Sequence, residues 1–414
     1  MTVDTAKTAL AELQAKQAAY GHALALINYD GSTTAPKGTA ANRAQTMSIL
    51  SAESYRLATG QETVELLEYL DANRSELSEK EERSVDLLLK GINQLKKIPM
   101  DQYIELQKLL VESDHAWHLA KENNDWASYR PYLEKVFDFH KRIAAWVEPE
   151  KDPYDYLTKA RCDEFFATLR SRIVPLLEKV MAAPAHNRDM LTGHFPADKQ
   201  EELSYWLMKT IGLDLEHVGL ATTEHPFTTS LGSHFDERIT TRYDESDLGF
   251  SLFAVIHEGG HALYDTGSAD DLAYTALDGG VSMGIHESQS RFYENVLGRS
   301  KAFCSILFPK LQELFPQQME GYTVDDLYKA VNCVRPSLIR IQADELTYAL
   351  HIMIRYEMEK RYFAGELAIA DFPATWNALY KEYLGIDVPS DSEGVLQDSH
   401  WSFGAIGYFP SYAL

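Results

Sequence analysis

The strongest constraint on this chain is the segment H-E-G-G-H at residues 257–261, which follows a mostly apolar run at residues 250–256. Such a run predicts a buried helix. Two histidines four positions apart on a helix lie on the same face, one turn apart, so both imidazoles can bind one zinc ion. Glu258 is then held beside the metal, where it can take a proton from a zinc-bound water. The alternative is a core helix whose two histidines are simply hydrogen-bonded.

Two consecutive glycines, Gly259 and Gly260, lie in the middle of this predicted helix. Each costs about 1 kcal/mol of helix stability relative to alanine. Such a cost is reasonable where another chain must approach the backbone closely. A substrate chain lying against the helix is one such case.

A hydrolytic zinc site needs a third protein ligand and one open position. A second helical stretch at residues 283–298 follows a glycine-rich turn at residues 279–280 and offers two candidates. Glu287 is the expected ligand, and His286 competes with it because spacing alone excludes neither. The predicted ligand set is His257, His261 and Glu287.

Arg291 and Glu294 follow Glu287 by one and two helical turns. Residues at this spacing share a helix face. They are candidates for orienting Glu287 through hydrogen bonds. A solvated row of ion pairs is the equally plain alternative.

Composition excludes several classes of protein. The 414 residues carry a net charge of −23, which argues against nucleic acid and anionic membranes as partners. Three cysteines, far apart in the sequence, form no metal or redox pattern and fit a reduced, cytoplasmic compartment. The first 17 residues lack the basic start and apolar core of a signal peptide. No apolar run approaches the roughly 20 residues needed to cross a bilayer.

The first half of the chain is predicted to be helical. A break at Asp152-Pro153 suggests an N-terminal helical lobe at residues 1–150 and a catalytic helical lobe at residues 151–414. One continuous domain is the alternative. The expected helices of the first lobe span residues 2–26, which end near a turn at residues 30–32, and residues 41–58, 62–73, 78–97, 101–123 and 126–147.

The second half adds one β element to further helices. Residues 224–243 are rich in β-prone side chains around Gly232 and predict a hairpin. This hairpin could offer an edge strand to an extended peptide, or it could merely pack. The expected helices span residues 162–181, 197–211, 301–315, 324–364 and 369–383.

Arg335 and Arg340 lie close in sequence to the acidic pair at residues 344–345. A guanidinium near a zinc site is a suitable bidentate partner for a carboxylate. More often such an arginine pairs with a neighbouring acid.

Several motifs together resemble those of one known family. H-E-G-G-H at residues 257–261, followed by H-E-S-Q-S-R at residues 286–291, is similar to the carboxypeptidase Taq family of metallocarboxypeptidases. Four further segments resemble family motifs in the same order. They are H-P-F at 225–227, D-E-R-I-T at 236–240, I-R-I-Q-A-D-E at 339–345 and G-V-L-Q-D-S-H-W at 394–401.

The resemblance implies a mainly α, two-lobed fold with a deep active-site cleft, similar in shape to neurolysin and angiotensin-converting enzyme. It also implies removal of single residues from peptide C-termini, a zinc or cobalt ion, and a homodimer. The matching positions imply that His257, His261 and Glu287 bind the metal and that Glu258 is the general base. They also suggest that Arg340, Arg238 and His225 bind substrate and that His400 and Tyr408 polarise the scissile carbonyl.

The sequence departs from the family at several places. The family usually continues for some tens of residues beyond residues 408–410, whereas this chain stops at Leu414. Tyr29 and Ala35 replace a tryptophan and a methionine. Two other functions therefore stay open. One is an endo- or dipeptidyl-peptidase on the same scaffold, and the other is an inactive peptide-binding or scaffold protein.

Overall fold

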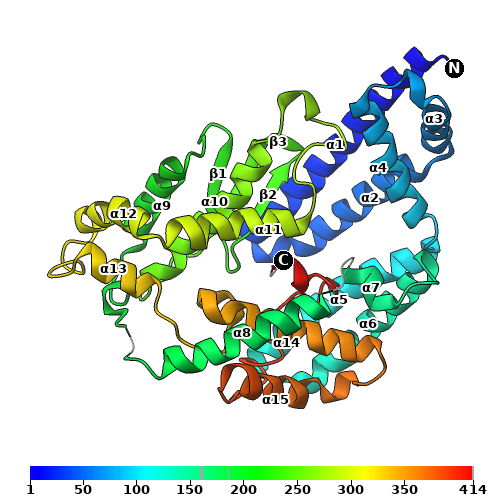
Figure 1. Cartoon of the computed structure of the whole chain (residues 1–414). Helices are drawn as coiled ribbons and strands as arrows, with labels where there is room; N and C mark the ends of the chain where they lie inside the picture. Colours follow the sequence, from blue (N-terminus) through cyan, green and yellow to red (C-terminus); the bar gives the residue numbers. More distant parts are fainter. Residues whose placement is uncertain (159–161, 185, 413–414) are drawn as a thin grey trace. The chain divides into compact units, whose positions relative to one another are not determined.

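The computed structural model describes residues 1–158, 162–184 and 186–412, and most of these residues lie in helices (Figure 1). One small sheet accompanies them. The predicted mainly α class is therefore confirmed. Among the described helices, none combines the length and the apolar character that a membrane span requires.

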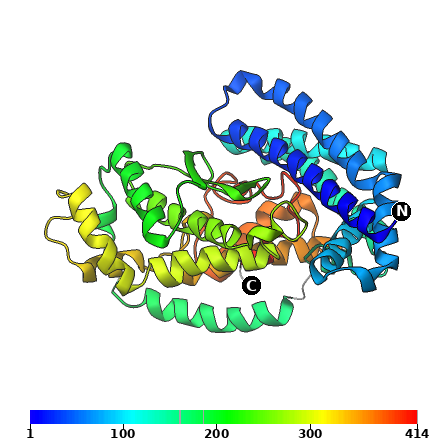
Figure 2. The same cartoon turned by 90° about the horizontal axis from the view of Figure 1, so that it is seen from above.

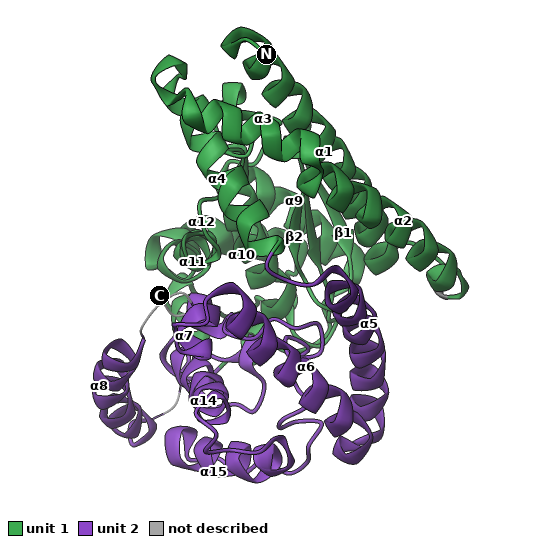
Figure 3. Cartoon of the chain, turned by 90° about the vertical axis from the view of Figure 1, so that its right-hand side faces the viewer, with its two compact units in different colours: residues 1–96, 188–331 green, residues 97–187, 332–414 purple. Residues whose placement is uncertain are grey.

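The chain forms two compact units, each built from two separate stretches of sequence. Unit 1 contains residues 1–96 and 188–331, and unit 2 contains residues 97–187 and 332–414 (Figure 3). The predicted boundary near residue 150 divides the chain differently and stays a prediction.

Unit 1 begins with four helices that enclose their own small core. α1 (Val3–Thr33), α3 (Gln61–Ala72) and α4 (Glu79–Leu95) bury leucines and Val85 against one another, and α2 (Ala40–Thr59) packs on α1. Ser78 caps α4 through the predicted capping box with Glu81. The turn expected at residues 30–32 was wrong because α1 continues through Gly31.

The rest of unit 1 is built around a central helix, α10 (Leu248–Thr266). α9 (Ala197–Ile211), α11 (Met283–Arg291) and the π-helical turn η5 (Phe292–Gly298) pack against it. α12 (Lys301–Leu314) and α13 (Val324–Val331) complete the layer. A second apolar core fills the space between these helices. α10 is therefore surrounded by protein on several sides, as its apolar sequence predicts.

A three-stranded sheet lies beside α10 in the two views of Figures 1 and 2. β2 (Thr228–Leu231) and β3 (Ser233–Thr241) form the predicted hairpin around Gly232, which has a positive φ of 80°. β1 (Val218–Thr222) pairs in parallel with β3 and was not predicted. The strand order β1-β3-β2 leaves β2 at an edge.

The described residues of unit 2 form six α-helices around an aromatic core. Their bounds are α5 (Met100–Asn123), α6 (Trp126–Val147), α7 (Pro153–Thr158), α8 (Asp163–Met181), α14 (Glu345–Phe363) and α15 (Phe372–Leu384). The single helix expected over residues 324–364 was wrong. α13 ends at Val331 and α14 begins at Glu345, where Asp344 caps the helix by accepting from the Leu346 and Thr347 N–H groups. Pro336 lies in the connection and disfavours helix at the residue before it.

One buried acid in the sheet leads to a pH-dependent prediction. Glu237 on β3 is fully buried, and burial raises the pKa of its carboxyl to about 8; the Ser230 hydroxyl opposes this shift, whereas Asp265 and Asp278 add to it. In the unfolded chain the same carboxyl ionises near pH 4.5. Between these values the unfolded state loses its proton first, so stability falls as pH rises.

We expect Glu237→Gln to be more stable than the parent above neutral pH. The difference in free energy of unfolding between the variant and the parent should grow by about 1.4 kcal/mol per pH unit between about pH 5 and pH 8. Urea unfolding of both proteins across this range, with a chelator present, measures it. The exposed Glu216→Gln serves as the control. If the free energies of unfolding of the parent and Glu237→Gln differ by a constant amount across this pH range, the raised pKa of Glu237 is contradicted.

Candidate active site

α10 carries the H-E-G-G-H segment in its second half. Asp247 caps the helix by accepting a hydrogen bond from the Gly249 N–H at 2.8 Å. The glycines serve helix packing, which corrects the expectation of a substrate against this backbone. A Cβ on Gly259 would lie 2.5 Å from Ile211 of α9, and a Cβ on Gly260 would lie 2.7 Å from the backbone of Ser290 in α11.

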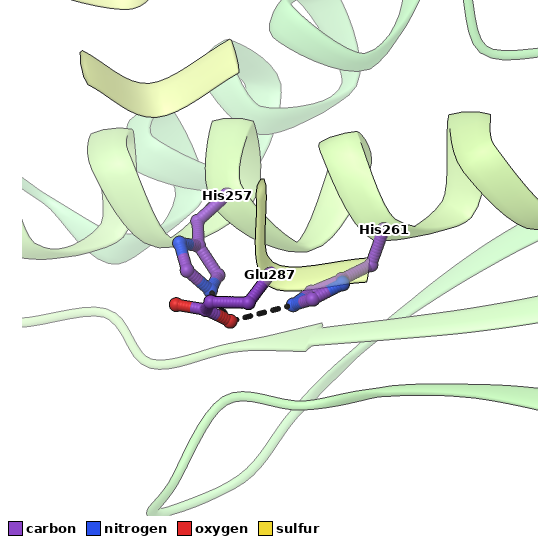
Figure 4. A group of neighbouring side chains, drawn as sticks. All are labelled: His257, His261 and Glu287. Atoms are coloured by element: carbon purple, nitrogen blue, oxygen red, sulfur yellow. Dashed lines mark ion pairs between the residues drawn. The ribbon is translucent and has the colours of Figure 1, made fainter. Parts of the chain in front are cut away.

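The two histidines and Glu287 converge on one point. His257 and His261 project from the same side of α10 toward the Glu287 carboxylate of α11 (Figure 4). The Oε2 atom of Glu287 lies 3.7 Å from His257 Nε2 and 3.3 Å from His261 Nε2. One ligand atom from each of the three residues lies within 4.8 Å of the others. Three donors on two helices thus face one small volume.

His286, the competing ligand, lies behind His261. Its Nδ1 atom is 3.0 Å from His261 Nδ1, and its Nε2 atom is 2.9 Å from the carboxylate of Asp265. If His286 Nε2 donates to Asp265, its Nδ1 accepts from His261 Nδ1–H. The lone pair of His261 Nε2 then faces Glu287. These hydrogen bonds favour Glu287 as the third ligand. His286 then orients the imidazole of His261.

Glu294 orients His257 through a hydrogen bond to its Nδ1 atom, as His286 orients His261. This Nδ1 atom lies 2.9 Å from Glu294 Oε2, which leaves Nε2 facing Glu287. Arg291 and Arg299 donate to the same carboxylate at 2.9 and 3.0 Å. Burial raises the pKa of Glu294, but Arg291, His257 and Arg299 outweigh it and hold that pKa well below its usual range. Glu294 therefore stays ionised and accepts the Nδ1–H of His257, which directs Nε2 toward Glu287.

The charges at this site favour a cation. Burial opposes protonation of His257, but the carboxylates of Glu287, Glu294 and Glu258 outweigh burial and raise its pKa to about 9. The same negative charge favours a bound metal cation. The Oε1 atom of Glu287 is buried and has no hydrogen-bond partner among the described residues. Two imidazole nitrogens and one carboxylate fit a catalytic zinc centre with an open position.

The hydrogen bonds behind His261 lead to a prediction about metal affinity. We expect Asp265→Asn to weaken metal binding by about 10- to 100-fold, since His286 loses the charged partner that orients it. Titration against a chromophoric chelator measures the dissociation constant. Asp270→Asn, an exposed acid in the turn after α10, is the matched control. If Asp265→Asn binds the metal as tightly as the parent, the hydrogen-bonded pair of Asp265 and His286 does not orient His261.

The remaining predicted residues of unit 1 lie in or near the sheet. Glu258 follows His257 on α10 and is largely buried. Arg238 on β3 donates to Asp236 at 2.6 Å, and its guanidinium lies 6.0 Å from the Tyr29 ring. His225 is exposed in the loop before β2.

Three predicted residues, Arg340, His400 and Tyr408, belong to unit 2. Arg340 is buried, binds Asp398 through two nitrogens at 3.1 and 3.0 Å, and donates to the Tyr348 hydroxyl at 3.0 Å. His400 Nε2 lies 2.9 Å from the Tyr412 hydroxyl, and its ring stacks on Tyr408 at 5.7 Å. Asp398 is hydrogen-bonded to Arg340 and lies 3.8 Å from His400 Nδ1, whereas Tyr408 contacts His400 through its ring.

Two residues that contact the site were not predicted from the sequence. Asp265 lies four positions after His261, and this spacing on α10 could have indicated it. Thr228 donates to Glu258 Oε2 at 2.6 Å from a separate strand. Nothing in the sequence indicates that pairing, because it depends on how the hairpin packs on α10.

Comparisons with known proteins identify the family of the chain. The family model described as carboxypeptidase Taq (M32) metallopeptidase matches residues 9–414. Carboxypeptidase 1 of Bacillus subtilis (strain 168) is 40% identical over 423 residues, covering 100% of this chain and 84% of that protein. Thermostable carboxypeptidase 1 of Pyrococcus furiosus is 35% identical over 407 residues, covering 96% of this chain and 81% of that protein.

A solved structure shares the fold over nearly the whole chain. The M32 carboxypeptidase from Deinococcus radiodurans R1 superposes with a TM-score of 0.94 and 38% sequence identity, covering 99% of this chain and 84% of that chain. These matches reach from the first helix through α10 and α11 to the C-terminal motifs. The chain therefore belongs to the carboxypeptidase Taq (M32) family of metallopeptidases and is a metallocarboxypeptidase.

Proposed function

We propose that this metallocarboxypeptidase removes single residues from the C-terminus of peptides and that its metal is zinc, with cobalt as a substitute. The observation that carries this proposal is the convergence of His257, His261 and Glu287, with Glu258 next to them on α10. Nitrogen and carboxylate donors suit zinc.

The reaction follows from the placement of these groups. A divalent ion held here would act as a Lewis acid and lower the pKa of its water. Glu258 removes a proton from the attacking water and later passes it to the leaving amine. We assign His400 and Tyr408 to stabilisation of the oxyanion, and His225 to substrate binding. These three assignments rest on the motif resemblance.

The terminal carboxylate of the substrate requires a cationic partner, and exposure favours Arg238 over Arg340. The Arg340 side chain is 6% exposed and its guanidinium is already bound to Asp398. The Arg238 side chain is 36% exposed and has one carboxylate partner, Asp236. A guanidinium with open donors can bind a second carboxylate bidentately. We therefore propose Arg238 as the first contact of the terminal carboxylate and keep Arg340 as the second candidate.

Other features of the proposed function concern partners and location. We propose that the protein acts in the cytoplasm as a homodimer. Its partners are peptides, and the net charge of −23 argues against nucleic acid. Three buried cysteines with no disulfide among the described residues are consistent with a reducing compartment.

Product mapping by mass spectrometry tests the function. A peptide with a free C-terminus should lose one residue at a time in the presence of zinc or cobalt, and its C-terminally amidated copy should stay intact. Equal cleavage of both peptides at internal bonds would instead establish an endopeptidase, and removal of residue pairs a dipeptidyl-peptidase. A metal-loaded protein that releases nothing from either peptide would support the inactive peptide-binding protein.

A further inference from the structure

The edge strand β2 runs along α10 and presents alternate side chains to it. Thr228 lies opposite the fully buried Ile239 in the hairpin register, so both side chains share the face toward α10. Ser230, two residues further on, shares this face, and its Oγ atom lies 3.4 Å from Asp265. β2 thus reaches α10 at two points, and Glu258 is the partner at the first of them.

The Thr228 hydroxyl contacts Glu258 twice. Its Oγ1 atom lies 2.6 Å from the carboxylate oxygen Oε2 and 3.0 Å from the backbone carbonyl oxygen of the same residue. A hydroxyl carries one proton, and a short bond to a carboxylate is the stronger of the two. The proton therefore goes to Oε2, so this oxygen is held against β2.

The other carboxylate oxygen of Glu258 has no hydrogen bond within the described ranges of the chain. A glutamate side chain has three rotatable bonds, and fixing it costs conformational entropy. A hydrogen bond from β2 reduces the number of orientations that the free side chain can adopt. Oε1 is then presented in one direction as the proton acceptor, as a general base requires.

We propose that Thr228 is a positioning residue for Glu258: its hydroxyl holds Oε2 and thereby aims Oε1 at the water that attacks the peptide. This inference rests on the proposed function, because it requires Glu258 to be the base. Thr228 acts only through Glu258. Its loss should therefore change the rate of the chemical step and leave metal binding and substrate binding unchanged.

Replacing Thr228 with valine removes the hydroxyl and keeps the shape. We expect kcat to fall by about 10- to 100-fold, as for loss of one hydrogen bond to a charged group, with KM unchanged. Metal content and melting temperature should match the parent. Thr228→Ser, which keeps the hydroxyl, should recover most of the rate. Thr222→Val removes an exposed hydroxyl from β1 and is the control for the loss of a sheet threonine.

A double-mutant cycle separates positioning from other effects. If Thr228 acts through the carboxylate, adding Thr228→Val to Glu258→Gln should leave the residual rate almost unchanged. An equal loss in both backgrounds would overturn the proposal. A serine variant as slow as the valine variant, or a change confined to KM, would overturn it as well.

Crystal structures of the parent and Thr228→Val add a readout that does not need turnover. In the variant the Glu258 carboxylate should leave β2 or occupy several rotamers. An unchanged, ordered carboxylate would refute the positioning role even in an active enzyme. If the parent releases no residue from a free peptide, the proposed function fails, while this comparison still shows whether Thr228 holds Glu258.

Discussion

Glu258→Gln should keep its metal and lose almost all turnover, with kcat lower by about 10³-fold. The amide has nearly the shape of the carboxylate, but it has no negative charge and cannot take a proton from water. The three ligand side chains of His257, His261 and Glu287 are untouched. The Thr228 hydroxyl can still donate to the amide oxygen. The loss should therefore appear in the chemical step alone.

Two measurements check this result together. Free amino acid released from a simple peptide gives kcat and KM, and elemental analysis gives the metal content of the same sample. Glu216→Gln, an exposed change of the same kind, controls for the loss of one negative charge. A Glu258→Gln variant with near-normal turnover would remove Glu258 from the role of general base. Loss of metal from this variant would mean that Glu258 contributes to the metal site itself.

Glu287→Gln should lower metal affinity by more than about 100-fold, beyond what removal of an orienting residue causes. Glu287 supplies the carboxylate toward which both Nε2 atoms point, and neutralising it leaves two ligands. Burial alone would raise the pKa of Glu287, but the positive charges and hydrogen bonds of His257, His261 and Arg291 outweigh burial. The pKa is therefore lower than usual, and Glu287 is ionised in the parent. The glutamine also removes much of the negative charge that attracts the cation.

His286→Gln is the matched comparison, since the same substitution is then made at the competing position. If Glu287 is the ligand, His286→Gln keeps its metal with moderately weaker affinity, and Glu287→Gln loses it. Competition with a chelator of known affinity gives both dissociation constants. The reverse order would make His286 the third ligand and would require the hydrogen bonds behind His261 to rearrange.

The sequence predicted best where local signals act alone. α6 (Trp126–Val147) and α9 (Ala197–Ile211) have the predicted bounds, because cap residues and apolar periodicity mark their ends. The pairing of His257 and His261 in the candidate metal site follows from the same logic, since helical spacing places them on one face.

Other features depend on tertiary packing. β1 (Val218–Thr222) is a five-residue strand whose parallel pairing with β3 has no local signal. Arg291 and Glu294 were candidates for orienting Glu287, with an ion-pair row as the alternative, but Glu294 accepts from His257 and pairs with Arg291. Helical spacing fails there because the chain turns π-helical after Arg291, so the usual periodicity ends.

Anomalous diffraction at the zinc edge, from crystals grown with zinc, tests the account most directly. We expect one peak per chain, about 2.0 to 2.2 Å from His257 Nε2, His261 Nε2 and one oxygen of Glu287. A peak at other residues, or zinc bound by His286 in place of Glu287, would contradict the metal centre on which the proposed reaction depends.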